Sequence, residues 1–398
     1  MNSLRIVKNA EGVNGVVLSN NCVLLIERSE AKLDGYSYER YYMYNLEKNT
    51  RVEIAPNIPK LNIIKISDIS KHPEFVYFSN FDLKDDGNVE IRIFRYSIIE
   101  KNCKKIYSII DDYEKYQRYM RTHVFVLNEF YMLIQNELLR ANVADNFEDY
   151  FDFELSMFNI LQNETKKIVD ENLTSNGISD ILLISENVCV LKSGFSLLKN
   201  NRFEHLEKDE VSVESISFVN LGQLVSDIII SKNNIVMDTI EQTFFTATIP
   251  YVEVSGEYFI YSKFNFERRE EEVVFYNYKT KESQVCINKN ESTDINLAKA
   301  CIFNGKPYLK LDTQKGIEFY NIIDKKSDFI FDNGDKFEVA MNDIVIGSNE
   351  KKGLFSKNFS YINVYKYPGL ALVHKEKGKY IGCITDGSGN IYILTKKG

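Results

Sequence analysis

The chain has 398 residues, of which 44% are hydrophobic, 13% aromatic and 27% charged. This composition supports a sizeable core and argues against wholesale disorder. The formal net charge of −8, without a clustered basic face, argues against nucleic-acid binding. The sequence has no apolar run of about 18 residues and no secretory signal at its start, so we expect a cytoplasmic protein without a membrane partner.

The clearest pattern lies between Glu257 and Ile287. Three short runs rich in Tyr, Phe, Val and Ile are separated there by two polar connections. Strand-forming residues between polar turns are typical of antiparallel strands joined as hairpins. This stretch therefore predicts part of a small antiparallel sheet.

The first half of the chain contains the same arrangement three times. The first unit spans residues 16–54 and the second spans 61–109, in which Asp85-Asp86-Gly87-Asn88 is a strong turn signal, because Gly and Asn tolerate positive φ. The third unit opens with a polar segment, 111–122, that could form a short surface helix, and it ends near Asp170.

The second half is less regular at first. A fourth unit begins at 181–192, and the segment 211–224, inside the poorly defined region 193–248, could be strand or helix. The remaining units are 250–287, 298–331, 337–367 and 370–396. The last of these has three predicted strands and no fourth.

An aromatic residue followed by Asn marks the third strand of several units. The pairs are Tyr44-Asn45, Phe158-Asn159, Tyr276-Asn277 and Tyr320-Asn321, with Phe94 at the equivalent place in the second unit. The 118 residues from Phe158 to Tyr276 are about two repeats, which indicates one degenerate unit between them. Periods of about 40–50 residues with four strands each are typical of β-propeller blades.

These features predict an all-β chain that forms a single β-propeller domain over residues 1–398. It would have eight four-stranded antiparallel blades, or seven if the last two units merge. Because residues 4–7 form an unassigned strand and the last unit lacks one, we expect the N- and C-terminal strands to pair and close the propeller. A pair of β-sandwich domains is the alternative.

The chain resembles β-propeller repeat proteins in general, through this architecture alone. It has no Trp and therefore lacks the Trp-Asp signature of WD40 repeats, and no kelch-type double glycine recurs. The resemblance points to no specific family, so it assigns no functional residue.

Local motifs for catalysis and for cofactors are missing from the sequence. There is no Gly-x-Ser-x-Gly nucleophile elbow and no phosphate-binding loop, and the six cysteines form no Cys-x-x-Cys pair. In the stretch 82–90, Lys84 stands where a calcium loop needs an oxygen ligand. No two of the four histidines lie within five positions of each other. The four are His72, His123, His205 and His374. We therefore expect no catalytic, metal or cofactor site that local sequence would identify.

The segment 141–154 is the most unusual stretch. It reads ANVADNFEDYFDFE, in which carboxylates alternate with aromatic residues, and it lies between two predicted strands of the third unit. Exposed aromatic residues ringed by charge suit an interface, although an ordinary solvated loop explains them as well. The candidate partner-binding residues are Asp145, Asp149, Tyr150, Phe151 and Asp152.

The leading functional hypothesis is a non-enzymatic cytoplasmic propeller that serves as a scaffold for a protein or peptide partner. One alternative is an enzyme, a glycan-processing hydrolase or lyase, whose carboxylates converge in the axial channel from several blades. A second alternative is a sensor that binds a small ligand. The sequence leaves the oligomeric state and the identity of any ligand open.

Overall fold

The fold is described from a computed structural model of the 398-residue chain. The structure describes residues 4–8, 12–18, 21–28, 39–58, 61–64, 74–84, 88–111, 120–139, 151–185, 188–193, 214–243, 252–254, 258–289, 297–303, 306–313, 316–332, 334–352, 358–367, 369–386 and 389–396. The chain divides into two compact units, which are described separately. The N-terminal unit comprises residues 11–199 and 212–242, and the C-terminal unit comprises 1–10, 200–211 and 243–398. The prediction of one domain over 1–398 stays a prediction.

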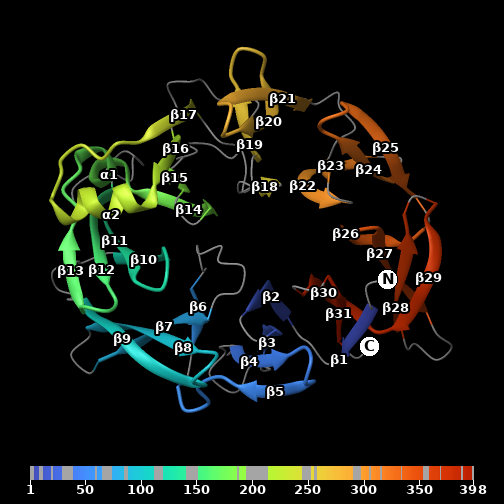
Figure 1. The fold of residues 1–398 in the computed structure, drawn as a ribbon, viewed down its shortest axis with the longest axis horizontal. Coiled ribbons are helices and arrows are strands. Elements are labelled where there is room, and N and C mark those ends of the chain that lie inside the picture. The colour runs from blue at the N-terminus through green and yellow to red at the C-terminus, as the bar shows by residue number, and fades with distance from the viewer. Residues whose placement is uncertain are drawn as a thin grey trace. The chain divides into compact units, whose positions relative to one another are not determined.

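The N-terminal unit contains four sheets of four strands each, in which neighbouring strands follow one another in the sequence (Figure 1). The first two sheets are β2–β5 (Gly12–Leu18, Cys22–Arg28, Glu39–Asn45, Thr50–Glu53) and β6–β9 (Asn62–Ile63, Phe75–Leu83, Val89–Ser97, Asn102–Asp111). The next two are β10–β13 (Met120–Val126, Tyr131–Leu139, Phe151–Asn159, Glu164–Lys167) and β14–β17 (Ile178–Ser185, Val188–Ser193, Glu214–Asn220, Asp238–Thr243).

The C-terminal unit contains three four-stranded sheets and one three-stranded sheet among its described residues. The four-stranded sheets are β18–β21 (Val252–Val254, Tyr258–Asn265, Glu270–Asn277, Glu282–Lys289), β22–β25 (Leu297–Phe303, Lys306–Thr313, Gly316–Asn321, Lys326–Phe331) and β26–β29 (Lys336–Met341, Ile344–Lys352, Asn358–Lys366, Ala371–Lys377). The three-stranded sheet has the order β1 (Leu4–Lys8), β31 (Ile391–Lys396), β30 (Lys379–Thr385).

The predicted pairing of the terminal strands is confirmed. Strand β1 lies parallel to β31, with Leu4 opposite Ile391 and Lys8 opposite Thr395. The predicted division of the last two units needs a correction, because the first strand of 370–396 is β29, the fourth strand of the sheet before it. The described residues thus form eight sheets, and the N-terminal strand is the third strand of the last one.

The Asn of the aromatic-Asn marker closes the turn between the third and fourth strands. Asn159 Oδ1 accepts hydrogen bonds from the backbone N–H groups of Leu161 and Gln162, at 3.0 Å each. In the second unit Ser97 holds the same place, since its Oγ accepts from the N–H of Glu100 at 3.1 Å. The aromatic residue of that unit is therefore Tyr96, which corrects the assignment to Phe94. The marker predicts these turns because only a short polar side chain can accept from the turn N–H groups.

The degenerate unit is the sheet β14–β17. Its third strand ends at Val219-Asn220, where Val replaces the aromatic residue and Asn220 Oδ1 accepts from the N–H of Gln223 at 3.0 Å. Here the Asn begins the helix α2 (Leu221–Ile229) instead of a turn. The segment 211–224, for which strand and helix were both open, is thus strand followed by helix in its described part.

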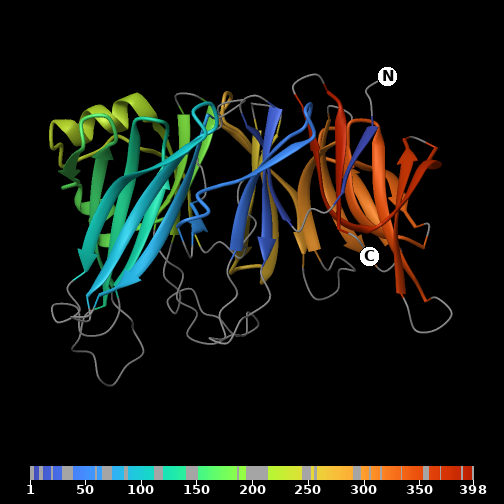
Figure 2. The ribbon, with the colours of Figure 1, turned by 90° about the horizontal axis from the view of Figure 1, so that it is seen from below.

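A second helix, α1 (Glu171–Asn176), precedes β14 and was not predicted. The predicted helix over 111–122 falls mostly outside the described residues, and its two ends belong to β9 and β10. Helices α1 and α2 lie side by side (Figures 1 and 2) and contribute Leu173, Leu221 and Leu224 to one apolar cluster with β11 and β12. No helix in the described residues is long and apolar enough to cross a membrane.

Apolar clusters lie between successive sheets of each unit. One cluster joins β2–β5 to β6–β9 through Leu24, Tyr41, Phe78 and Phe94. Others join β6–β9 to β10–β13 and, in the C-terminal unit, β22–β25 to β26–β29. A four-stranded sheet has two apolar faces, and within each unit these clusters bury an apolar face of one sheet against the next. The prediction of an all-β chain of four-stranded antiparallel sheets is confirmed.

Candidate functional site

A pocket of about 450 Å³ lies between the sheets β2–β5 and β6–β9 of the N-terminal unit. The β2–β3 connection, the β4–β5 turn and the β8–β9 turn supply much of its lining. Its volume falls within the range of small-molecule sites, roughly 300–1,000 Å³.

The floor of the pocket is apolar and buried. It is formed by Cys22, Met43, Tyr96 and Ile98, and exposed Val52 adds an apolar edge. Burial raises the pKa of the Cys22 thiol, although a hydrogen bond from Asn45 and the charges of Lys101 and Lys48 oppose this. Burial also raises the pKa of the Tyr96 hydroxyl. Both groups are therefore neutral near pH 7, and the floor suits the apolar face of a ligand.

The rim of the pocket is polar. Its residues are Asn21, Asn45, Glu47, Lys48, Thr50 and Lys101. Amide and hydroxyl groups of this kind donate hydrogen bonds to, and accept them from, ligand hydroxyls. A polar rim around an apolar floor is the usual arrangement of a small-molecule site.

Two turns hold the rim in place. In the β4–β5 turn, Asn45 Oδ1 accepts from the N–H of Lys48 at 2.7 Å, and Asn21 Nδ2 donates to Glu47 Oε1 at 2.6 Å. In the β8–β9 turn, Lys101 has a left-handed backbone with φ 55°. These contacts restrain the backbone from which the exposed Glu47, Lys48 and Lys101 side chains project.

The rim has two ammonium groups and one carboxylate. Lys48 and Lys101 form no ion pair with any carboxylate among the described residues, whereas their neighbour Lys104 pairs with Glu100 at 3.2 Å. The rim therefore carries an excess of positive charge in a chain whose net charge is −8. Sequence reasoning missed this site because Lys48 and Lys101 belong to different sheets.

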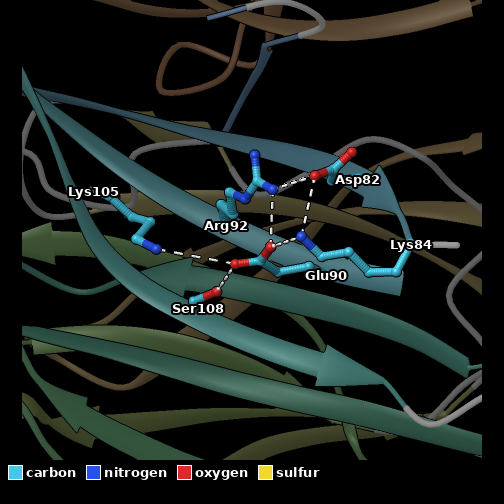
Figure 3. Close-up of polar contacts among 6 residues, drawn as sticks. All are labelled: Asp82, Lys84, Glu90, Arg92, Lys105 and Ser108. Carbon is cyan, nitrogen blue, oxygen red and sulfur yellow. Dashed lines mark hydrogen bonds and ion pairs between the residues drawn. The ribbon is translucent and has the colours of Figure 1, made fainter. Parts of the chain in front are cut away.

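A second group of charged residues lies on strands β7–β9 and beside them (Figure 3). Glu90 Oε2 accepts from Lys84 Nζ at 2.6 Å and from Arg92 Nη2 at 2.8 Å, and Ser108 Oγ donates to Glu90 Oε1 at 2.5 Å. Asp82 pairs with the same two cations, and Lys105 lies 4.0 Å from Glu90. The two carboxylates thus share two cations on one face of the sheet.

The chemistry of this group is that of fixed charges. Hydrogen bonds from Arg92, Lys84 and Ser108 hold the pKa of Glu90 well below its usual range. Hydrogen bonding to Lys84 also lowers the pKa of Asp82, with the charge of Arg92 adding to it. A catalytic acid needs a raised pKa so that it keeps its proton near neutral pH. Glu90 and Asp82 are therefore suited to hold the sheet together, and not to donate protons.

The predicted partner-binding residues are only partly described. Asp145, Asp149 and Tyr150 lie outside the described residues. Phe151 and Asp152, predicted in a loop, instead begin strand β12, opposite Leu139 and Leu138. Their part in binding a partner stays a prediction.

No group of three or more His, Cys, Asp or Glu side chains gathers in the described part of the chain in a way that could hold a metal ion. His72 and His205 lie outside the described residues.

The comparisons with known proteins identify a fold. No family model and no curated protein sequence matches the chain. The chain resembles the solved dipeptidyl peptidase 4 of Porphyromonas gingivalis with 11% identity and a TM-score of 0.53, over 94% of this chain and 56% of that one. It therefore spans little more than half of that protein's length.

Two further solved structures match this chain over most of their own length. The β-propeller domain of the trilobed protease from Pyrococcus furiosus matches with 13% identity and a TM-score of 0.47, over 92% of this chain and 96% of that one. Oligogalacturonate lyase from Vibrio parahaemolyticus matches with 10% identity and a TM-score of 0.44, over 86% of this chain and 95% of that one.

These comparisons correct the leading functional hypothesis. A non-enzymatic scaffold is the wrong description, because the dipeptidyl peptidase that the chain resembles is an enzyme. The alternative hypothesis of an enzyme agrees better with this comparison. At identities of this size the likeness establishes architecture alone, and that architecture is the β-propeller, built from four-stranded antiparallel blades and indicating no specific family.

Proposed function

We propose that the chain is a glycan-processing enzyme, a hydrolase or a lyase, which binds its substrate in the pocket between β2–β5 and β6–β9. The observation that carries this proposal is the lining of the pocket, in which hydrogen-bonding side chains surround an apolar floor. Sugars present hydroxyl groups at their edges and C–H groups on their faces. An apolar floor with a polar rim can contact both at once.

Glu47 is the proton-accepting residue in this proposal. Its carboxylate lines the pocket and is oriented by the hydrogen bond from Asn21 Nδ2. A lyase needs a base that removes a proton from carbon. A hydrolase needs a carboxylate that activates water or attacks the sugar and also an acid that protonates the leaving group, and in the described pocket lining that acid has to be the ammonium group of Lys48 or Lys101. Lys48 and Lys101 lie on the same rim and supply the positive charge that stabilises negative charge developing on the substrate.

The test is to incubate the full chain with oligosaccharides, both neutral and acidic, and with peptides, and to identify the products by mass. A hydrolase adds water to its products, whereas a lyase leaves an unsaturated sugar and adds none. We expect cleavage of an oligosaccharide and none of the peptides.

Two variants assign the activity to the pocket. Glu47→Gln should abolish cleavage and leave the melting temperature unchanged. Glu100→Gln is the matched control, since this exposed carboxylate belongs to the neighbouring turn and does not line the pocket. Equal cleavage by wild type and Glu47→Gln, or cleavage of peptides alone, would contradict the proposal.

The cellular location is also a proposal. Four cysteines whose side chains the structure describes form no disulfide among the described residues: Cys22, Cys103, Cys286 and Cys383. Reduced thiols are usual where the compartment is reducing. We therefore propose that the protein acts in the cytoplasm.

A further inference from the structure

The charge of the pocket rim points to the class of substrate. Lys48 and Lys101 project from two different turns and line one pocket. Two cations that converge on one small site, without a carboxylate partner in the described residues, leave their charge for a ligand.

The turn geometry makes this convergence a feature of the fold. Asn45 and Ser97 occupy the same position in successive sheets, because each lies five residues before its partner in the following strand: Asn45 opposite Thr50, and Ser97 opposite Asn102. Lys48 is the third residue after Asn45, and Lys101 is the fourth residue after Ser97. Each lysine is therefore carried by a hydrogen-bonded turn and not by a long loop.

We infer that the pocket binds an acidic sugar unit, whose carboxylate lies between Lys48 and Lys101 and whose C–H face lies on Met43 and Tyr96. This inference rests on the proposed function, because it names the substrate class of the same site. A charge-assisted hydrogen bond to a carboxylate is roughly twice as strong as a neutral one. A neutral sugar of the same shape leaves both ammonium groups unpaired, so the rim selects for the acid.

The remaining rim groups complete the recognition. Thr50 lies on the rim beside Lys48 and can bind a hydroxyl group of the sugar. Glu47 repels a second carboxylate, which favours one acidic group per bound unit. Because the lysines are exposed, their attraction for the ligand weakens as salt screens it.

The test is to titrate the full chain with galacturonate and with galactose in a calorimeter. We expect binding of galacturonate, and binding of galactose that is weaker by roughly tenfold or more, the factor that the loss of one charge-assisted contact produces. Lys48→Met, Lys101→Met and the double variant should weaken galacturonate binding by a larger factor than galactose binding. Lys104→Met is the matched control, because this exposed lysine lies in the same hairpin and pairs with Glu100 outside the pocket.

The outcomes separate this inference from the proposed function. Equal affinity for the two sugars, stronger binding of a dipeptide than of galacturonate, or wild-type affinity in the double variant overturns the inference. Binding of galacturonate that depends on both lysines, without cleavage of any oligosaccharide, supports the inference and contradicts the enzyme. Cleavage of neutral oligosaccharides with no preference for acidic ones supports the enzyme and contradicts the inference.

Discussion

Leu4, at the start of the chain, lies opposite Ile391 in the last strand, and the parallel register continues to Lys8 opposite Thr395. This pairing places Val7 in the interior, where only 4% of it is exposed. On the other face, Leu4 and Ile6 pack against the cluster that contains Ile391 and Ile393. The N-terminal strand is therefore a structural part of the last sheet.

Replacing Val7 with Asp should destabilise the C-terminal unit. A carboxylate at this buried position has to be protonated or drawn into water, and either change disrupts the pairing of β1 with β31. We expect a loss of about 3 kcal/mol in the free energy of unfolding, measured by urea denaturation.

Arg5→Ala is the control for this substitution. Arg5 is on the same strand but exposed, with its guanidinium 5.8 Å from the centre of the Tyr392 ring. We expect a loss below about 1 kcal/mol. If Val7→Asp unfolds at the same urea concentration as wild type, β1 does not contribute to the stability of the sheet.

The marker Asn residues should each stabilise their turn. Asn159→Ala removes the acceptor of the Leu161 and Gln162 N–H groups and should lower the free energy of unfolding by about 1 kcal/mol. Asn159→Asp keeps an acceptor oxygen at the same place and should lower the free energy of unfolding much less. Urea denaturation of both variants tests this, and equal losses would mean that the side-chain acceptor has no role in the turn.

The repeat was predictable from the sequence because these turns have a chemical requirement. An Asn or Ser must accept from the turn, and this residue recurs after the aromatic residue of the third strand. With Tyr96 and Val219 added from the register, the marker falls at positions 44, 96, 158, 219, 276 and 320, whereas in the sheet β26–β29 Tyr365 is followed by Lys366 and the marker is missing. The unit around Val219 was unclear because its Asn begins a helix, which local propensity does not distinguish from a turn.

The fourth residue after the marker Asn offers a way to stabilise the protein. Lys281 and Lys325 have left-handed backbones, with φ of 60° and 53°, which L residues other than Asn and Asp adopt at a cost. Glycine adopts this conformation without that cost. Lys281→Gly and Lys325→Gly should each raise the free energy of unfolding by about 0.5 kcal/mol, after allowing for the greater freedom of Gly in the unfolded chain.

Alanine is the control at these two positions, because it removes the same side chain but keeps the Cβ atom. Lys281→Ala and Lys325→Ala should give no gain. A gain of equal size for Ala and Gly would attribute the effect to the lost lysine charge and not to the backbone.

The pocket could not have been predicted in the same way. Lys48 and Lys101 stand in unremarkable turn sequences, and each is an ordinary exposed lysine by itself. Their meeting depends on which face of β2–β5 packs on β6–β9, and contacts such as that of Tyr41 with Phe78, whose ring centres are 4.9 Å apart, establish this. The one signal in the sequence for this pocket was that both lysines lie in equivalent turns. Using it required the assignment of Ser97 as the equivalent of Asn45.

Asp335 should make the stability of the C-terminal unit depend on pH. Its carboxylate accepts from Asn349 Nδ2 at 2.6 Å, from Asn363 Nδ2 at 2.8 Å and from the Tyr365 hydroxyl. Burial acts to raise the pKa of Asp335, but the hydrogen bonds from Tyr365, Asn363 and Asn349 outweigh it and the pKa is lowered. A lowered pKa in the folded state means that the ionised carboxylate stabilises the fold above its unfolded value, 3.8, and that this stabilisation is lost as the pH falls through the folded value.

Asp335→Asn should therefore lower the free energy of unfolding most near neutral pH. An amide cannot accept all three hydrogen bonds and carries no charge, so we expect a loss of about 2 kcal/mol near pH 7, measured by urea denaturation. Near pH 3 or below, where protonation removes part of the wild-type advantage, the difference between the two proteins should shrink. Asp332→Asn, an exposed carboxylate in the same connection, is the control and should change stability little near neutral pH. A difference between wild type and Asp335→Asn that stays constant from neutral to acid pH would show that the three hydrogen bonds do not depend on the charge of Asp335.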